Sequence, residues 1–142
     1  MKVIITGATG MVGKGVLLEC LDHTEVTEVL AIGRRSLEMQ HPKLKELIHK
    51  DFTEFGSVKT ELTGYDACYH CMGVSAAGMK EEEYWKMTHG ISLALAKTLL
   101  EVNPEITFTY VSGQGTDSLL WHAFVMFTMS PISSGYFPES NP

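Results

Sequence analysis

Three glycines near the start of the chain have the spacing of a turn that binds phosphate. They form a Gly-x-x-Gly-x-x-Gly pattern directly after the apolar run 3–5. Glycine permits positive φ, and it lets a ligand approach the backbone because it has no Cβ. A helix that begins behind such a turn directs free N–H groups and the positive end of its dipole at the ligand. The pattern therefore predicts a dinucleotide site, whose expected contacts are Gly7, Thr9, Gly10, Met11, Val12 and Gly13.

Two other interpretations of this turn have to be considered. A P-loop needs Gly-x-x-x-x-Gly-Lys-Ser/Thr, and Gly13-Lys14 would supply its central pair. Ala8 and Gly15 stand at the two ends of that motif, however, so both ends fail. A tight turn with only a structural role is the second alternative. The apolar run before the turn and the amphipathic segment after it favour nucleotide binding.

A pair of arginines indicates which dinucleotide would bind. In an NAD site, an Asp or Glu about 20 residues beyond the glycines bonds the ribose 2′-hydroxyl. This chain has Arg34 and Arg35 there, directly after Gly33. A guanidinium is a planar fork of donors that suits a phosphate. The pair predicts NADP in preference to NAD, with a solvated loop as the alternative.

The elements that would position these residues alternate between strands and helices. Strands are predicted at 2–6, 27–33, 46–50, 65–72 and 106–112, and helices at 11–23, 53–62 and 80–102. This order predicts an α/β fold with a doubly wound parallel sheet and a ligand crevice at the carboxyl ends of the strands. Residues 1–118 would form the dinucleotide-binding domain, and residues 119–142 an apolar tail.

Composition narrows the classes of partner. The 142 residues suit one domain, and 44% apolar with 20% charged residues is typical of a globular protein. A net charge of −6 argues against a nucleic-acid partner. We expect neither a signal peptide nor a membrane span, because no apolar run reaches about 20 residues. Three cysteines without a signal sequence predict a cytoplasmic protein.

Cysteines and histidines do not indicate a metal site. Cys68 and Cys71 form a Cys-x-x-Cys pair within a predicted strand, where side chains three residues apart point to opposite faces. A zinc site would need further ligands at suitable spacing, and the six histidines do not supply them. His70 and His89 are the two histidines that we expect near the crevice.

Three segments resemble a known family. Residues 6–13 are similar to the Thr-Gly-Ala-Thr-Gly-x-x-Gly turn of extended and atypical short-chain dehydrogenase/reductases, in particular the NAD-dependent epimerase/dehydratase and NmrA-like branch. Residues 71–75 and 111–118 look like segments of small bacterial nucleoside-diphosphate-sugar epimerase-like proteins. The resemblance covers residues 1 to about 118, and it implies a Rossmann fold with a dinucleotide cofactor.

The resemblance also implies roles for residues that follow later strands. Asp51 and Phe52 would lie beside the adenine, although Asp51 is equally suited to cap a helix. The segment Cys71-Met72-Gly73 would run against the ribose and nicotinamide. Ser112 would orient a substrate carbonyl, as the one catalytic candidate; a hydroxyl that only bonds backbone is the alternative.

The family's proton-transfer pair is missing from this sequence. Short-chain dehydrogenases use Tyr-x-x-x-Lys, and no Tyr here has a Lys four residues later. Residues 119–142 also depart from the family, as expected of a truncated or frame-altered product. Three functions therefore stay open: an NADP-dependent oxidoreductase or epimerase acting on a carbonyl or sugar, a dinucleotide-sensing module without turnover, and a domain that self-associates as a homo-oligomer through residues 119–132.

Overall fold

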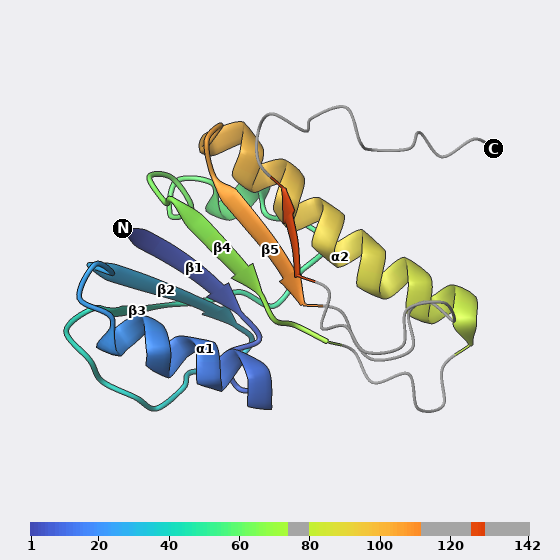
Figure 1. The fold of residues 1–142 in the computed structure, drawn as a ribbon. Helices are drawn as coiled ribbons and strands as arrows, with labels where there is room; N and C mark the ends of the chain where they lie inside the picture. The colour runs from blue at the N-terminus through green and yellow to red at the C-terminus, as the bar shows by residue number, and fades with distance from the viewer. Residues whose placement is uncertain (74–79, 112–125, 130–142) are drawn as a thin grey trace.

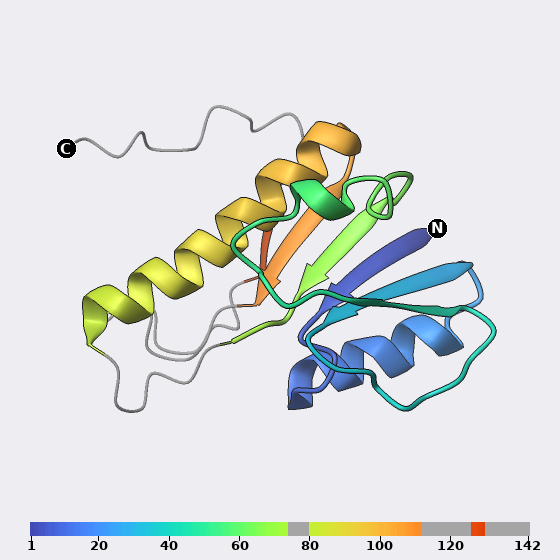
Figure 2. The same ribbon diagram turned by 180° about the vertical axis from the view of Figure 1, so that it is seen from behind.

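The computed structural model describes residues 1–73, 80–111 and 126–129, which form six strands, two helices and one 3-10 turn. Figures 1 and 2 show them from opposite sides. In chain order they are β1 (Lys2–Thr6), α1 (Met11–Asp22), β2 (Glu28–Gly33), β3 (Leu44–Ile48), the 3-10 turn (Gly56–Val58), β4 (Ala67–His70), α2 (Glu81–Val102), β5 (Thr107–Val111) and β6 (Met126–Met129).

The strands form a single sheet in the order β3-β2-β1-β4-β5-β6. The first five strands along the chain are parallel, and β6 pairs antiparallel with β5. The chain moves outward from β1 to β2 and β3, then returns to place β4 on the other side of β1. This reversal is the point at which doubly wound sheets bind ligands. The predicted Rossmann fold is confirmed.

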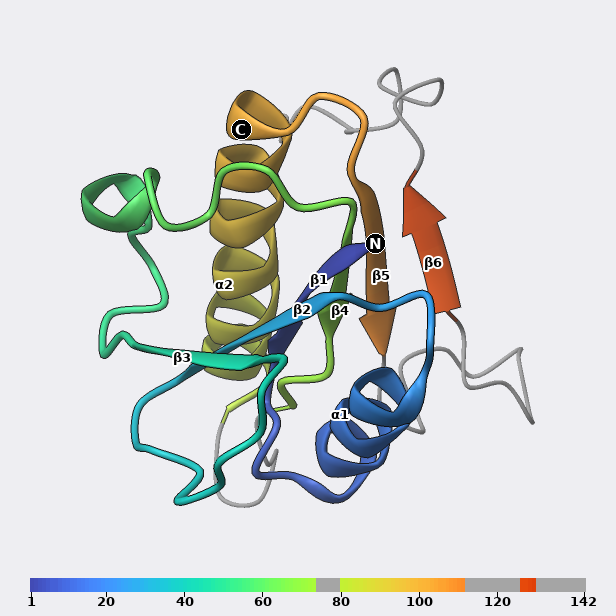
Figure 3. The ribbon, with the colours of Figure 1, turned by 90° about the vertical axis from the view of Figure 1, so that its left-hand side faces the viewer.

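The two helices cover opposite faces of the sheet, as Figure 3 shows from the side. Side chains alternate along β1, so Val3 and Ile5 pack with Leu17 and Leu21 of α1. Ile4 points the other way and packs with Leu95 of α2 and its neighbours. Strands buried on both faces explain the continuous apolar run in the sequence.

The helix predicted over residues 53–62 does not form. This segment contains only the 3-10 turn Gly56–Val58 and further turns. Phe55 and Leu62 are nevertheless buried, in the cluster that packs against α2. Glycine at 56 and a β-branched residue at 58 weaken a helix, and the apolar residues can reach the core without one.

The antiparallel strand β6 is not predicted by the sequence pattern, which assigned residues 119–142 to a tail. Its four residues pair with 108–111 of β5. The sheet is therefore parallel only as far as β5. In the part of the chain that the structure describes, neither helix is both long and apolar enough to span a bilayer.

Candidate functional site

An open cavity of about 480 Å³ lies at the carboxyl ends of β1, β2 and β4. It therefore occupies the point where the strand order reverses, as the sequence predicts. Its lining brings together residues that are far apart in the sequence. They are Gly7, Ala8, Thr9, Gly10, Ala31, Ile32, Gly33, Arg34, Arg35, Leu37, Glu46, Phe52, Cys71, Met72 and Gly73.

Two of the three glycines in the first turn are required by packing. Gly7 has φ +73°, and a Cβ there would lie 2.7 Å from the backbone of Cys71 and Met72. A Cβ on Gly13 would lie 2.1 Å from the carbonyl oxygen of Gly7. The first glycine thus lets the turn approach the end of β4, and the third lets α1 approach the turn.

Gly10 differs from the other two, because the protein itself does not need a glycine there. Its φ of −79° and ψ of 164° are open to any residue, and a Cβ would come no closer than 3.4 Å to a neighbouring atom. Gly10 lines the cavity. A side chain at this position would occupy space that is open to a ligand, which is the role of the middle glycine in a dinucleotide turn.

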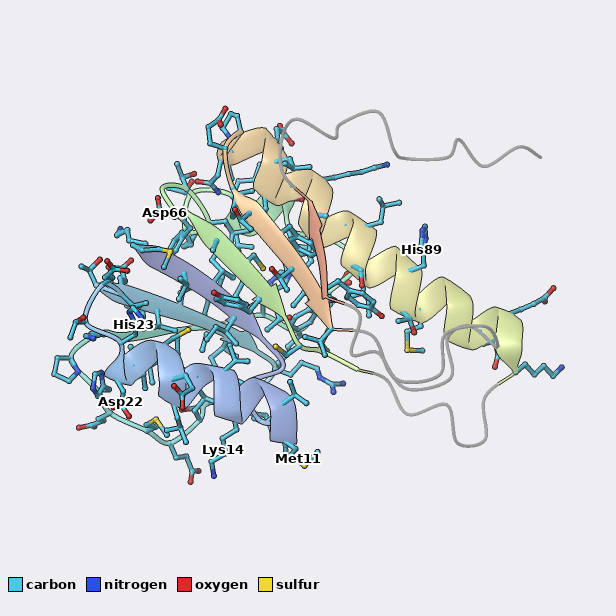
Figure 4. All side chains as sticks on the ribbon, in the orientation of Figure 1. Met11, Lys14, Asp22, His23, Asp66 and His89 are labelled. Atoms are coloured by element: carbon cyan, nitrogen blue, oxygen red, sulfur yellow. The ribbon has the colours of Figure 1, made fainter. Side chains whose placement is uncertain are left out.

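The start of α1 reaches this end of the cavity through Gly10. Gly10 is the N-cap and makes no side-chain cap hydrogen bond. The first N–H groups of a helix have no partner within the helix, and they favour an anion. Met11, Val12 and Gly13 form this first turn but do not line the cavity. Met11 is 90% exposed, and Figure 4 shows it at the free end of α1, pointing away from the sheet.

Arg34 and Arg35 follow β2 and line the same cavity as the glycines. Both are exposed. Among the described residues, neither makes an ion pair with a carboxylate. The cavity therefore has Gly10, the N-cap of α1, on one side and Arg34 and Arg35 on another, which suits a ligand with phosphates at two separate positions.

Asp51 and Phe52 take different places. Phe52 is buried and lines the cavity. Asp51 does not line it: its Oδ1 accepts hydrogen bonds from Thr53 N–H at 2.9 Å and Thr53 Oγ1–H at 2.5 Å. These bonds hold the pKa of Asp51 below its ordinary value. The carboxylate thus closes a local turn rather than capping a helix.

The segment after β4 forms another wall of the cavity, through Cys71, Met72 and Gly73. The Cys71 N–H donates to the carbonyl of Thr6 at 3.1 Å and joins the ends of β1 and β4. Burial raises the pKa of the Cys71 thiol to about 11. Cys71 is therefore a neutral wall residue at neutral pH.

His70 lies beneath this wall rather than in it. It is 1% exposed, and its ring stacks against the rings of Phe108 and Tyr110. The Ser92 hydroxyl donates to the carbonyl of Thr88 at 2.8 Å, so it accepts from His70 Nε2–H at 3.0 Å. His70 Nδ1 is then the acceptor for the Thr6 hydroxyl at 2.6 Å. Burial lowers the pKa of His70 to about 4, which keeps the ring neutral.

Other predicted residues lie away from the cavity or outside the described structure. His89 is exposed on the side of α2 that points away from the sheet (Figure 4). Cys68 is buried in the cluster beneath α2, and both it and Cys71 are free thiols. Within the described ranges, no three His, Cys, Asp or Glu side chains gather as metal ligands. Ser112, the catalytic candidate, lies outside the described residues.

Glu46 is an ionisable residue of the cavity lining that the sequence pattern did not predict. It projects from the middle of β3, beside Ala31 of β2. Its carboxylate accepts hydrogen bonds from the chain just beyond the arginine pair. Nothing in the local pattern of 44–48 distinguishes it from a surface residue on an edge strand.

Comparison with known proteins identifies the family to which this chain belongs. The model of the NAD dependent epimerase/dehydratase family matches residues 3–116. Protein FMP52 of Chaetomium globosum is 27% identical over 124 residues, which cover 82% of this chain and 51% of that protein. The fmp52-2 protein of Aspergillus oryzae is 28% identical over 114 residues, covering 79% of this chain and 49% of that protein. The chain thus spans about half the length of these relatives.

Solved structures agree on the fold. A glucuronic acid dehydrogenase from Chromohalobacter salexigens superposes with a TM-score of 0.68 at 17% identity, over 84% of this chain and 43% of that one. A uronate dehydrogenase variant from Agrobacterium tumefaciens, complexed with NAD, has a TM-score of 0.62 at 18% identity, over 79% and 40% of the two chains.

The relatives also correct one expectation. The cysteine content predicted a cytoplasmic protein, but the FMP52 relatives are named as mitochondrial proteins. Free thiols are compatible with either compartment, so cysteine count could not distinguish them. The family match covers the glycine turn, the arginine pair and all five parallel strands. This chain belongs to the NAD dependent epimerase/dehydratase family and has its NAD(P)-binding Rossmann fold.

Proposed function

We propose that the cavity binds NADP(H) in preference to NAD(H). The observation that carries the proposal is that Arg34 and Arg35 share one cavity with the glycine turn, without an ion pair to any described residue. The pyrophosphate would lie at Gly10 and the first turn of α1, and the 2′-phosphate at the two guanidiniums. A cavity of 480 Å³ is within the range of about 300–1,000 Å³ typical of small-ligand sites.

The rest of the cavity suits the other parts of this cofactor. Phe52 and Leu37 offer apolar surface for an adenine near the arginines. Cys71, Met72 and Gly73 would run along the ribose on the nicotinamide side. Gly73 is exposed, and a Cβ there would meet no atom within 4 Å, so the backbone is open to a ligand at this position too.

The chemistry that we propose is that of an oxidoreductase or epimerase acting on a carbonyl or sugar substrate. Bound NADP would supply hydride transfer at its nicotinamide ring, and this chain would bind and orient it. The thiol of Cys71, in the wall formed by residues 71–73, and His70, buried beneath that wall, are both neutral. The support for this reading is the family match and the fold.

A second function is favoured by one observation in the sequence. No Tyr among the 142 residues is followed four residues later by Lys, so the usual proton-transfer pair is not available from this sequence. This favours a dinucleotide-sensing module that binds without turnover. Turnover of carbonyl substrates in the presence of NADPH would support the enzyme and exclude the sensing module.

A charge-reversal variant tests the cofactor assignment. We expect Arg34→Glu combined with Arg35→Ala to weaken NADPH binding at least about 100-fold, because two charge-assisted phosphate contacts are lost. NADH binding should change by less than about threefold. Cofactor fluorescence reports both titrations. An equal loss for the two cofactors would contradict the 2′-phosphate site.

A further inference from the structure

Glu46 connects β3 to the turn that carries the two arginines. It pairs with Ala31 across the β2–β3 ladder and lines the cavity. Leu44 packs on the α1 face of the sheet and Leu47 on the α2 face. Because side chains alternate along a strand, Glu46 lies on the α1 face, the same face as Leu44.

Both carboxylate oxygens of Glu46 are occupied by the turn after Arg35. Oε2 accepts a hydrogen bond from the Leu37 N–H at 2.9 Å, and Oε1 accepts one from the Ser36 hydroxyl at 3.3 Å. The Ser36 oxygen in turn accepts from the N–H of Glu38 at 3.1 Å. The carboxylate therefore bonds directly to two consecutive residues of this turn, and through the Ser36 hydroxyl it is connected to a third.

The backbone on the other side of the arginines is also fixed. The carbonyl of Gly33 accepts a hydrogen bond from the N–H of His49 at 2.9 Å. Leu37 adds an apolar contact with the cluster on the α1 face. The arginine side chains are exposed, so the direction they take depends on the backbone between Gly33 and Leu37.

We propose that Glu46 is a positioning residue for recognition of the 2′-phosphate, because it holds the 34–37 turn in the form that directs both arginines at the cavity. This inference rests on the proposed function. A carboxylate that faced a phosphate would weaken its binding through like-charge repulsion. The oxygens of Glu46 are directed to Ser36 and Leu37, so its hydrogen bonds carry the role, and its charge does not.

Two substitutions separate the hydrogen bonds from the charge. Glu46→Ala removes both, whereas Glu46→Gln removes the charge and can keep both bonds. The Gln oxygen would accept from Leu37 N–H, and its amide would donate to the Ser36 hydroxyl. Glu38→Ala is the matched control, since it removes a carboxylate from the same turn that makes no hydrogen bond or ion pair to the described residues.

The experiment is a titration of the whole chain and each variant with NADPH and with NADH. We expect Glu46→Ala to lose about tenfold or more in NADPH affinity and less than about threefold in NADH affinity. Glu46→Gln and Glu38→Ala should both stay within about threefold of wild type for either cofactor. An equal loss for both cofactors in Glu46→Ala, or a loss in Glu46→Gln that matches it, would overturn the inference.

The outcomes also separate this inference from the proposed function. Wild-type protein that binds neither cofactor overturns the proposed function itself. Wild-type selectivity for NADPH that Glu46→Ala leaves intact overturns only the role of Glu46. Should Glu46→Ala fail to fold, as judged by circular dichroism, Ser36→Ala replaces it. That variant removes one of the two bonds, and we expect a loss of about fivefold for NADPH and of less than about threefold for NADH. A loss of less than about threefold for NADPH would overturn the inference.

Discussion

The glycines of the first turn allow a test in which the same substitution has three different outcomes. Gly10, Gly13 and Gly15 lie within six residues of one another, and each can be changed to Ala. A Cβ on Gly13 would overlap the carbonyl oxygen of Gly7 at 2.1 Å, one on Gly10 would lie at 3.4 Å from the same atom, and one on Gly15 would meet nothing within 4 Å. The physical environment therefore differs while the chemical change stays constant.

The expected changes in the free energy of unfolding follow from these distances. Gly13→Ala gains about 1 kcal/mol in helix propensity. Its methyl group overpacks against a backbone atom, and the cost of such overpacking is typically about 1–3 kcal/mol; at this short distance the cost should be at or above the upper end of that range. We expect a net loss of about 2 kcal/mol. Gly15→Ala gains about 1 kcal/mol in the helix interior. Gly10→Ala should stay within about 1 kcal/mol of wild type, because a poorer N-cap offsets the lower entropy of the unfolded chain.

Binding should follow a different order from stability. Gly10→Ala should weaken NADPH at least about tenfold, since its methyl group occupies the space of the pyrophosphate. Gly15→Ala should bind as wild type does. Urea unfolding and cofactor titration on the same preparations measure the two quantities. Wild-type stability in Gly13→Ala would refute the packing argument, and wild-type binding in Gly10→Ala would refute the account of the cavity.

Three further predictions concern stability. Burial lowers the pKa of His70 from 6.5 to about 4, so as the pH falls the unfolded chain is protonated at this histidine before the folded chain is. The free energy of unfolding should therefore decrease by about 3 kcal/mol between pH 6.5 and pH 4. Urea unfolding at stepped pH measures this decrease, and His70→Asn should abolish it. The pKa of Glu28 is lowered from 4.5 to about 2, chiefly by the hydrogen bond from Lys45, so the ionised carboxylate stabilises the fold fully above pH 4.5 and this stabilisation is lost as the pH falls toward 2. Glu28→Gln should make the free energy of unfolding less dependent on pH between pH 4.5 and pH 2. The same pH dependence in wild type and variant would contradict this prediction. Asn103→Ala should cost about 2–4 kcal/mol in thermal or urea unfolding, because three backbone groups of residues 62–65 lose their partner; a loss below about 1 kcal/mol would mean that water replaces the side chain.

Most of the fold could be predicted from the sequence because its signals are local. The run 3–5 and the turn at Gly7 are adjacent, so a strand, a turn and a helix follow from about a dozen consecutive residues. The strand at 44–48 was placed two residues late, since it lies at the sheet edge and is only partly buried. The strand Met126–Met129 was missed because antiparallel pairing with β5 depends on a partner some 18 residues earlier in the chain.

In the candidate site, too, the residues next to local sequence signals could be predicted, and those placed by contacts between distant segments could not. Gly7 and Gly10, the arginine pair and the Cys71–Gly73 segment follow directly after strands, and the structure brings them to one cavity. Glu46 contacts a turn ten residues before it, through strand pairing that spacing alone does not reveal. Asp51 was left between two roles, and its hydrogen bonds with Thr53 show that it closes a turn in a segment where the predicted helix is absent.

The central claim is that one cavity recognises both the pyrophosphate and the 2′-phosphate of NADP(H). Equilibrium titration of the wild-type chain with NADPH and NADH at two salt concentrations tests it most directly. The account predicts tighter binding of NADPH, and a loss of affinity with added salt that is steeper for NADPH because the additional contacts are charged. Equal affinities with the same salt dependence, or no binding of either cofactor, would contradict it.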